Sequence, residues 1–179
     1  MTAFSPRDAG VAVIAVAALL TGCSSDPAPK AVSAAEVNPL TQCEPLTNEQ
    51  IQQAVHADTL TAHTTPPVCT WQAERAGVET DLTLTFTFTE HDSLQQIWDR
   101  AREDGYDTEH LTVTREALGT TITATGIYVR DPRDLGYCQV SVALNGTITW
   151  RVQNPSHTPA PDPCAIALEL ATLTIDLSP

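Results

Sequence analysis

Positively charged residues are scarce in this chain. Lys30 is the single lysine, and nine lysine and arginine residues stand against 22 aspartate and glutamate residues, which gives a formal charge of −13. A surface of this charge repels the phosphates of nucleic acids and the headgroups of anionic lipids. We therefore expect no nucleic-acid partner.

The sequence also lacks the patterns that mark the common classes of enzyme. It contains no G-x-S-x-G nucleophile turn, no H-E-x-x-H zinc site, no phosphate-binding loop and no calcium loop. The spacing C-x-x-C does not occur, and no two of the five histidines are four residues apart. We therefore expect a protein without enzymatic activity, cofactor or metal, whose histidines are solvated surface residues.

No apolar run is long enough to cross a membrane. Residues 11–20 (VAVIAVAALL) are purely aliphatic, but ten helical residues span only ~15 Å of the ~30 Å hydrocarbon layer. Arg7 precedes this run and small residues follow it, as in the signal peptides of exported proteins. The sequence predicts that residues 1–22 are a signal peptide.

The end of this segment, Leu20-Thr21-Gly22-Cys23, resembles the lipobox of bacterial lipoproteins. That resemblance implies cleavage after Gly22 and attachment of a diacylglycerol group to the thiol of Cys23. Two or three acyl chains anchor a protein stably, where a single chain does not. We therefore expect a lipid anchor at Cys23 on the extracytoplasmic face of the cell membrane. The alternative is an ordinary secretory signal with a cysteine nearby.

The chain after the lipobox divides into a tether and one domain. Residues 23–42 are mostly small, polar or proline, without an apolar period, which predicts a lipidated N-terminus followed by a flexible tether. A flexible chain of this length has a root-mean-square reach of about 25 Å. Residues 43–179 then form a single domain, for which a hydrophobic content of 42% supplies a core.

Capping patterns predict three helices in this domain. The N-cap and its partner are Thr47 with Gln50, Ser93 with Gln96, and Asp162 with Pro163. The second helix carries an apolar stripe that includes Trp98, and Gly105 ends it. We interpret Trp98, like Trp71 and Trp150, as a core residue, because each lies in the apolar phase of its element.

Strand patterns occupy most of the remaining domain. In residues 81–89 (DLTLTFTFT) leucine and phenylalanine alternate with threonine, so one face is apolar and the other carries hydroxyl groups. Further strands are expected at 68–73, 111–114 and 120–129 and on both sides of Asn145-Gly146. TAHTTPPVC (residues 61–69), which contains Pro66-Pro67, is expected to be irregular. The fold class is therefore α+β, with a single antiparallel sheet of about five to six strands and helices packed on its one apolar face.

The sequence allows two registers for the last hairpin and two roles for the threonine face of residues 81–89. A two-residue Asn-Gly turn places Val142 and Ile148 on opposite faces, whereas a three-residue loop with a bulge at Gly146 pairs them. We favour the bulged form because it gives the sheet a single apolar face.

The threonine face is either the open outside of the sheet, which we favour, or the polar wall of a groove.

If Cys23 carries lipid, an even number of cysteines remains for the domain: Cys43, Cys69, Cys138 and Cys164. In an exported protein this predicts two disulfides rather than a zinc site. Four cysteines allow three pairings, and the sequence does not choose among them. We prefer 43 with 69 and 138 with 164, since each bridge pins a terminal helix to the nearest strand and contributes ~3.5 kcal/mol. Pairing 43 with 164 and 69 with 138 stays open.

The cysteines and their neighbours resemble those of a known family. The pattern comprises C-x-x-L-T from Cys43, C-x-W from Cys69, C-x-V-x-V from Cys138 and D-P-C-x-x-A-x-x-L-A ending at Ala171. It resembles a family of actinobacterial lipoproteins, some of them mycobacterial, that is classed as a domain of unknown function. The resemblance covers about residues 42–179 and implies an extracytoplasmic, membrane-tethered domain without known catalytic residues.

We expect this domain to be a non-catalytic binding or interaction module that engages an envelope protein. One alternative is an envelope carrier of a small or lipidic ligand, which a large apolar cavity beneath the sheet would favour. Another is an envelope enzyme that acts through two converging carboxylates. The acidic residues 99, 103 and 104 do not favour that enzyme, because interleaved arginines indicate a solvated helix face.

Overall fold

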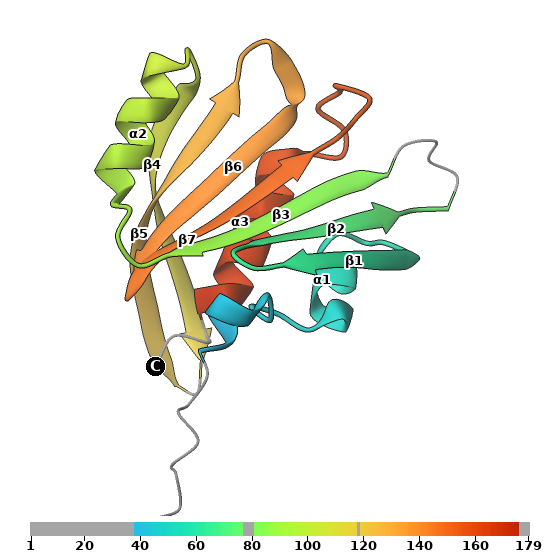
Figure 1. The fold of residues 1–179 in the computed structure, drawn as a ribbon, viewed down its shortest axis with the longest axis horizontal. Coiled ribbons are helices and arrows are strands. Elements are labelled where there is room, and N and C mark those ends of the chain that lie inside the picture. The colour runs from blue at the N-terminus through green and yellow to red at the C-terminus, as the bar shows by residue number, and fades with distance from the viewer. Residues whose placement is uncertain (1–37, 77–80, 118, 176–179) are drawn as a thin grey trace, which may run out of the picture. The chain divides into compact units, whose positions relative to one another are not determined.

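The structure is a computed structural model that describes residues 38–76, 81–117 and 119–175 (Figure 1). The expected signal peptide, Cys23 and the first part of the tether lie outside the described residues. The elements are, in chain order, η1 (Pro39–Gln42), α1 (Asn48–Ala54), β1 (Thr59–Thr65), β2 (Val68–Glu74), β3 (Leu82–Thr89), α2 (Leu94–Glu103), β4 (Asp107–Ala117), β5 (Thr120–Asp131), β6 (Asp134–Leu144), β7 (Gly146–Gln153) and α3 (Pro163–Thr174).

The strands form one antiparallel sheet in the order β1-β2-β3-β7-β6-β5-β4. The α+β class and the single antiparallel sheet are confirmed, but the sheet has seven strands rather than five to six. The additional strand is β1, of which residues 61–65 were expected to be irregular. It is an edge strand that is exposed along almost its whole length, so its sequence lacks the alternation that reveals a half-buried strand.

The two faces of the sheet differ because side chains alternate along each strand. On the face that we call the apolar face, Phe86 of β3, Trp150 of β7 and Val140 of β6 lie in register. The opposite face, which we call the polar face, carries the hydroxyl, amide and guanidinium side chains of the same three strands. These are Thr83, Thr85, Thr87, Thr89, Gln139, Ser141, Thr149 and Arg151.

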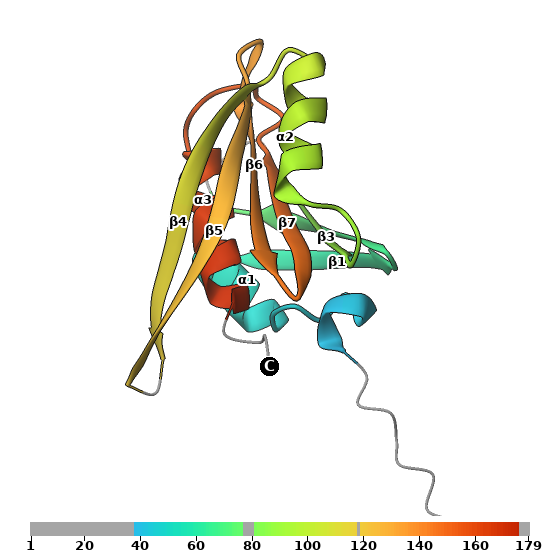
Figure 2. The same ribbon diagram turned by 90° about the vertical axis from the view of Figure 1, so that its left-hand side faces the viewer.

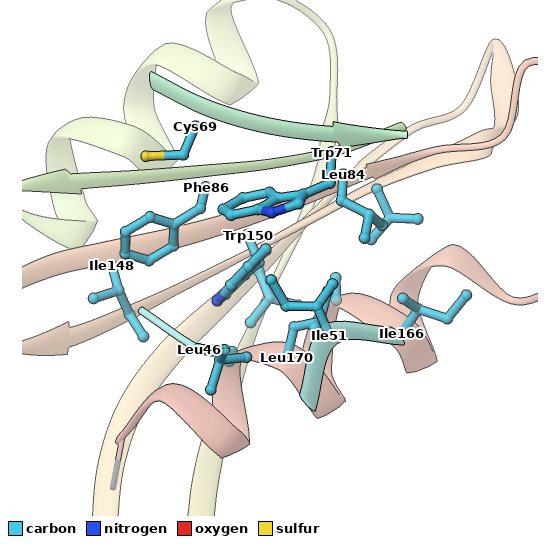
Figure 3. Close-up of a cluster of buried hydrophobic side chains, with 14 of the residues drawn as sticks. Leu46, Ile51, Cys69, Trp71, Leu84, Phe86, Ile148, Trp150, Ile166 and Leu170 are labelled. Carbon is cyan, nitrogen blue, oxygen red and sulfur yellow. The ribbon is translucent and has the colours of Figure 1, made fainter. Parts of the chain in front are cut away.

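The main core lies between the apolar face and the helices α1 and α3 (Figure 3). Trp71, Phe86 and Trp150 are fully buried, and the ring centroid of Trp150 lies 5.5 Å from that of Trp71 and 5.0 Å from that of Phe86. The indole nitrogen of Trp150 donates a hydrogen bond of 2.9 Å to the hydroxyl of Thr174 in α3. Trp71 and Trp150 are therefore core residues, as expected.

Helix α2 lies on the polar face, and this corrects the expectation that all helices cover one face. Ala101 of α2 packs with Ile127 and Val129, two residues of β5 that belong to a second, smaller cluster. Trp98 is only half-buried and stacks on His110 of β4 at 4.3 Å between ring centroids. Figure 2 shows α2 and α3 on opposite sides of the sheet. The apolar stripe of α2 predicts a buried side but does not specify which face of the sheet it meets.

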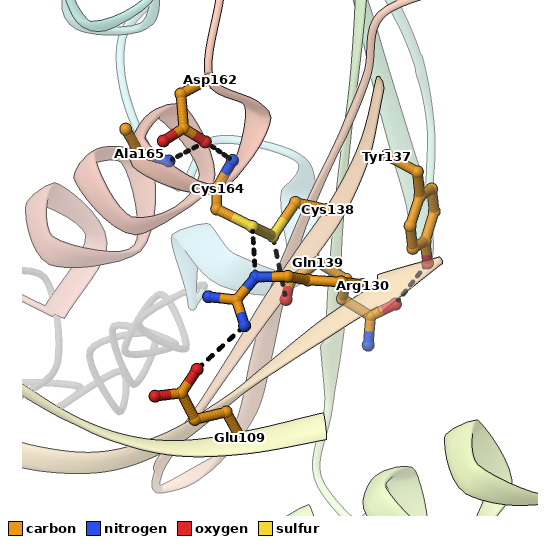
Figure 4. The surroundings of a disulfide bond; sticks show 8 residues. All are labelled: Glu109, Arg130, Tyr137, Cys138, Gln139, Asp162, Cys164 and Ala165. Atoms are coloured by element: carbon orange, nitrogen blue, oxygen red, sulfur yellow. Dashed lines mark hydrogen bonds and ion pairs between the residues drawn. A yellow bond between two sulfur atoms is a disulfide. The ribbon is translucent and has the colours of Figure 1, made fainter. Parts of the chain in front are cut away.

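Both preferred disulfides are present. Cys43 bonds to Cys69 and Cys138 bonds to Cys164, with Cα atoms 5.4 and 5.1 Å apart and 26 residues of separation in each case. The first bridge joins the segment before α1 to β2, and the second joins α3 to β6 (Figure 4). The alternative pairing is therefore excluded.

The boundary between tether and domain lies earlier than expected. Residues 39–42, which composition assigns to the tether, form η1, and Leu40 is buried in the core. The side chain of Asn38 accepts a hydrogen bond of 3.0 Å from the backbone N–H of Leu40, and Pro39 fits the first position of the helix. The segment is polar on average, so its composition does not reveal that Leu40 is buried.

The predicted helix starts and the hairpin register are confirmed. Capping boxes at Thr47 and Ser93 and the N-cap at Asp162 begin the three α-helices. In the last hairpin Val142 lies opposite Ile148, as the bulged form requires. The following pairs match too, with Val140 opposite Trp150. Gly146 has a φ of +136°, and a Cβ there would lie 2.8 Å from the carbonyl oxygen of Thr89, so only glycine fits.

Candidate functional site

A groove of about 320 Å³ lies between α2 and the polar face of the sheet. Its floor consists of residues from β3, β7 and β6 together with Val129 of β5, and its wall consists of α2 and the residues that flank this helix. From the sheet come Thr87, Thr89, Thr149, Arg151, Tyr137 and Gln139, and from the wall come Asp92, Ile97, Arg100, Asp104 and Tyr106. Its position follows from the packing of α2 on β4 and β5, which leaves the polar face of β7 and β3 uncovered.

A chain of hydrogen bonds runs beneath the floor of the groove. The hydroxyls of Thr149 and Ser141 lie 2.9 Å apart, and the amide nitrogen of Gln139 donates to the Ser141 hydroxyl at 3.2 Å. The amide oxygen of Gln139 accepts from the hydroxyl of Tyr137 at 3.3 Å, which Figure 4 shows, and from a guanidinium nitrogen of Arg151 at 3.2 Å. Ser141 is fully buried and Gln139 is 8% exposed. These contacts hold Arg151 in place from below.

Two tyrosines in the lining of the groove also lie close to Arg151. The rings of Tyr106 and Tyr137 stack at 5.6 Å, and the guanidinium carbon of Arg151 lies 5.8 Å from the centre of the Tyr137 ring. Burial raises the pKa of Tyr137, although the charge of Arg151 acts in the opposite direction. The phenol of Tyr137 therefore stays protonated at neutral pH and remains a hydrogen-bond donor to Gln139.

The arginines of the groove lack the ion pairs that Arg130 and Arg133 make elsewhere in the domain. Arg130 contacts Glu109 at 2.9 Å (Figure 4), and Arg133 contacts Asp131 at 2.7 Å. Within the described residues, neither Arg100 nor Arg151 has a carboxylate within 4.0 Å. Two guanidinium groups of an acidic protein thus face the same groove without an acidic partner from the described chain.

The groove is suited to binding by hydrogen bonds. The lining residues that the structure describes include no histidine, serine or cysteine that would act as a base or a nucleophile. Its two carboxylates, Asp92 and Asp104, lie at opposite ends of the ten-residue helix α2, which is roughly 15 Å long. Paired carboxylates in glycoside hydrolases lie about 5 to 9.5 Å apart, so Asp92 and Asp104 do not make such a pair.

The histidines, which we expected to be solvated, lie in several parts of the domain. His157, which is 69% exposed, lies 3.0 Å from the carboxylate of Asp134. Burial raises the pKa of Asp134, but hydrogen bonds from Gln153, His157 and the backbone of Gly136 outweigh this effect and leave the pKa below its ordinary value. Within the described ranges, no three histidine, cysteine or acidic side chains gather as metal ligands would.

A groove was the alternative that we did not favour for the threonine face, and part of its signal is present in the sequence. We favoured an open outer surface for the threonine face, whereas the structure places Thr87 and Thr89 in the floor of the groove. In β6 and β7, Tyr137, Gln139 and Arg151 occupy the same alternating phase as these threonines. Tyrosine and arginine at alternating positions on the polar face are a signal that an ordinary solvated sheet surface need not carry. The position of α2, which closes the groove, has no such signal.

None of the helices in the described parts of the chain combines the length and apolar character needed to cross a membrane. Comparison with curated proteins and with solved structures finds no match. One family, described as a protein of unknown function, matches residues 18–177, which is most of the chain and includes both disulfides and the groove. The chain therefore belongs to the DUF3558 family of proteins of unknown function.

Proposed function

We propose that this protein is a lipoprotein of the cell envelope, anchored through Cys23, whose domain is a non-catalytic binding module that takes its ligand or partner into the groove under α2. The lipobox-like sequence that ends at Cys23 supports the anchor. The groove supports the binding role, because it gathers hydroxyl, amide and guanidinium groups on one open surface. This groove is the observation on which the proposal depends.

The packing of the apolar face argues against the alternative of a lipidic ligand beneath the sheet. The rings of Trp71, Phe86 and Trp150 contact one another there and are at most 1% exposed. A lipid chain in this place would have to displace side chains whose burial stabilises the fold by several kcal/mol. A polar ligand in the groove displaces only solvent.

Membrane fractionation of the full-length protein in its host tests the anchor. The wild type is expected in the membrane fraction, and the Cys23→Ser variant is expected in the soluble fraction with its domain still folded. The Ser25→Ala variant is the matched control and should fractionate as the wild type does. If Cys23→Ser remains as membrane-bound as the wild type, the lipid anchor is wrong.

Photo-crosslinking in intact cells tests the binding role. A photoreactive residue at Thr89 lies in the groove, whereas one at Glu169 lies on the exposed side of α3 and serves as the control. We expect adducts from position 89 that are absent from position 169. Equal yields from the two positions, or no adduct from either, would contradict a binding role for the groove.

A further inference from the structure

We infer that the groove binds an oxyanion, either a carboxylate or a phosphate group, on a small hydroxylated ligand, and that Arg151 is its main anchor. This inference rests on the proposed function, because it names the chemistry of the ligand for that same groove. Four features carry it: the support of Arg151 from below, its missing acidic partner, the second arginine on α2, and the hydroxyl-bearing floor.

Arg151 is held in place before any ligand binds. One guanidinium nitrogen donates to the amide oxygen of Gln139 at 3.2 Å, and Gln139 is fixed by Tyr137 and Ser141. Gln139 is 92% buried, so this support is part of the folded interior rather than a surface contact. A guanidinium carries five N–H donors in a planar fork that matches the two oxygens of a carboxylate or phosphate. Its remaining donors are therefore positioned for bidentate binding at little entropic cost.

The charge of Arg151 is not neutralised within the described chain. Arg130 and Arg133 each contact a carboxylate at 2.9 Å or less, whereas Arg151 donates a hydrogen bond to the uncharged amide oxygen of Gln139. The acidic residues elsewhere repel an approaching anion, but at physiological salt this repulsion is screened beyond ~8 Å. A bidentate contact inside the groove therefore outweighs the net charge of the molecule.

The remaining lining specifies a small and hydroxylated ligand. Arg100 of α2 supplies a second cation, and Thr87 and Thr149 supply hydroxyls that donate and accept hydrogen bonds. Asp92 and Asp104 accept hydrogen bonds from ligand hydroxyls but repel further anionic groups. A volume of about 320 Å³ lies at the low end of small-molecule sites and matches one or two sugar-sized rings better than a polymer.

Chemical-shift mapping tests this inference. The full mature chain, with Cys23→Ser in place of the lipidated residue, is labelled with ¹⁵N and titrated at 0.15 M salt with glucuronate, glucose 6-phosphate and neutral glucose. We expect saturable shifts at Thr87, Thr149 and Arg151 with at least one of the two anions, at a Kd of about 1–10 mM, and no saturable shifts with glucose. The two anionic probes distinguish a carboxylate from a phosphate as the bound group.

Two charge-matched variants provide the control. The Arg151→Gln variant is expected to weaken binding at least tenfold, as the loss of a charge-assisted hydrogen bond predicts. The Arg102→Gln variant removes the same charge from α2 outside the groove and should bind as the wild type does. Shifts that survive Arg151→Gln, that occur equally with glucose, or that are absent with both anions would overturn the inference. None of these results would affect the lipid anchor or the crosslinking prediction for Thr89 in the wild type.

Discussion

The two faces of the sheet bind their helices in different ways. On the apolar face, α3 is joined to β6 by a disulfide, and the segment before α1 is joined to β2 by another. On the polar face, α2 has no covalent link and packs through a small cluster around Ala101. The difference indicates a division of roles in which the apolar face provides stability and the polar face provides a binding site that remains open beside α2.

Substitution of neighbouring residues on β3 should give the largest contrast between the faces. Phe86 points into the main core and is fully buried, whereas Thr85 points to the polar face. We expect Phe86→Ala to lower the free energy of unfolding by about 3–5 kcal/mol and Thr85→Ala to lower it by about 1 kcal/mol or less. Urea denaturation followed by circular dichroism measures both values. Equal losses would contradict the division between the faces.

Removal of a disulfide should have the next largest effect. Each bridge closes a loop of 26 residues, so the chain-entropy model gives a similar loss of ~3.5 kcal/mol for the double variants Cys43→Ser/Cys69→Ser and Cys138→Ser/Cys164→Ser. Urea denaturation of each variant without reductant, with the disulfide-bonded wild type as the reference, checks these values. A loss below about 1 kcal/mol for both pairs would show that the bridges do not stabilise the domain.

The cap of α2 should have a smaller and more local effect. The hydroxyl of Ser93 accepts a hydrogen bond of 3.2 Å from the backbone N–H of Gln96, and its loss in Ser93→Ala costs about 1 kcal/mol. Because α2 lacks a covalent link, we expect faster hydrogen exchange across α2 and little change in α3. The control is Asp162→Ala, which removes the cap of α3, where the disulfide should limit the change. Faster exchange throughout the domain in Ser93→Ala would contradict an independent α2.

The smallest predicted effect concerns pH. The pKa of Asp134 is lower in the folded protein than in the unfolded chain, so its ionised form stabilises the fold above the unfolded pKa. This contribution disappears as the pH falls through the lower, folded pKa. Because solvent screens the contact with the exposed His157, we expect Asp134→Asn to lower the free energy of unfolding by less than about 1 kcal/mol at pH 7, with a difference from the wild type that shrinks toward pH 3. A difference that does not depend on pH would show that ionisation of Asp134 is not the cause.

The elements that sequence predicts well are those set by local rules. Capping boxes, the Asp162-Pro163 helix start and the bulged register at Gly146 depend on a few adjacent residues, and all are present. Strand β1 has no local signal, because an edge strand exposed on both faces needs no alternation. The groove depends on where α2 lies, which is a tertiary property. One clue exists in β5, where Ile127, Tyr128 and Val129 form a continuous apolar run typical of a strand covered on both faces.

The crosslinking yield at Thr89 in the Arg151→Gln variant tests the division of roles most directly. Arg151 is exposed and contributes to the polar face alone, so its substitution should change the free energy of unfolding by about 1 kcal/mol or less. We predict that this folded, membrane-anchored variant loses most of the adducts that form at position 89 in the wild type. An undiminished yield in the folded variant would contradict the claim that the polar face, through Arg151, is the binding surface of this protein.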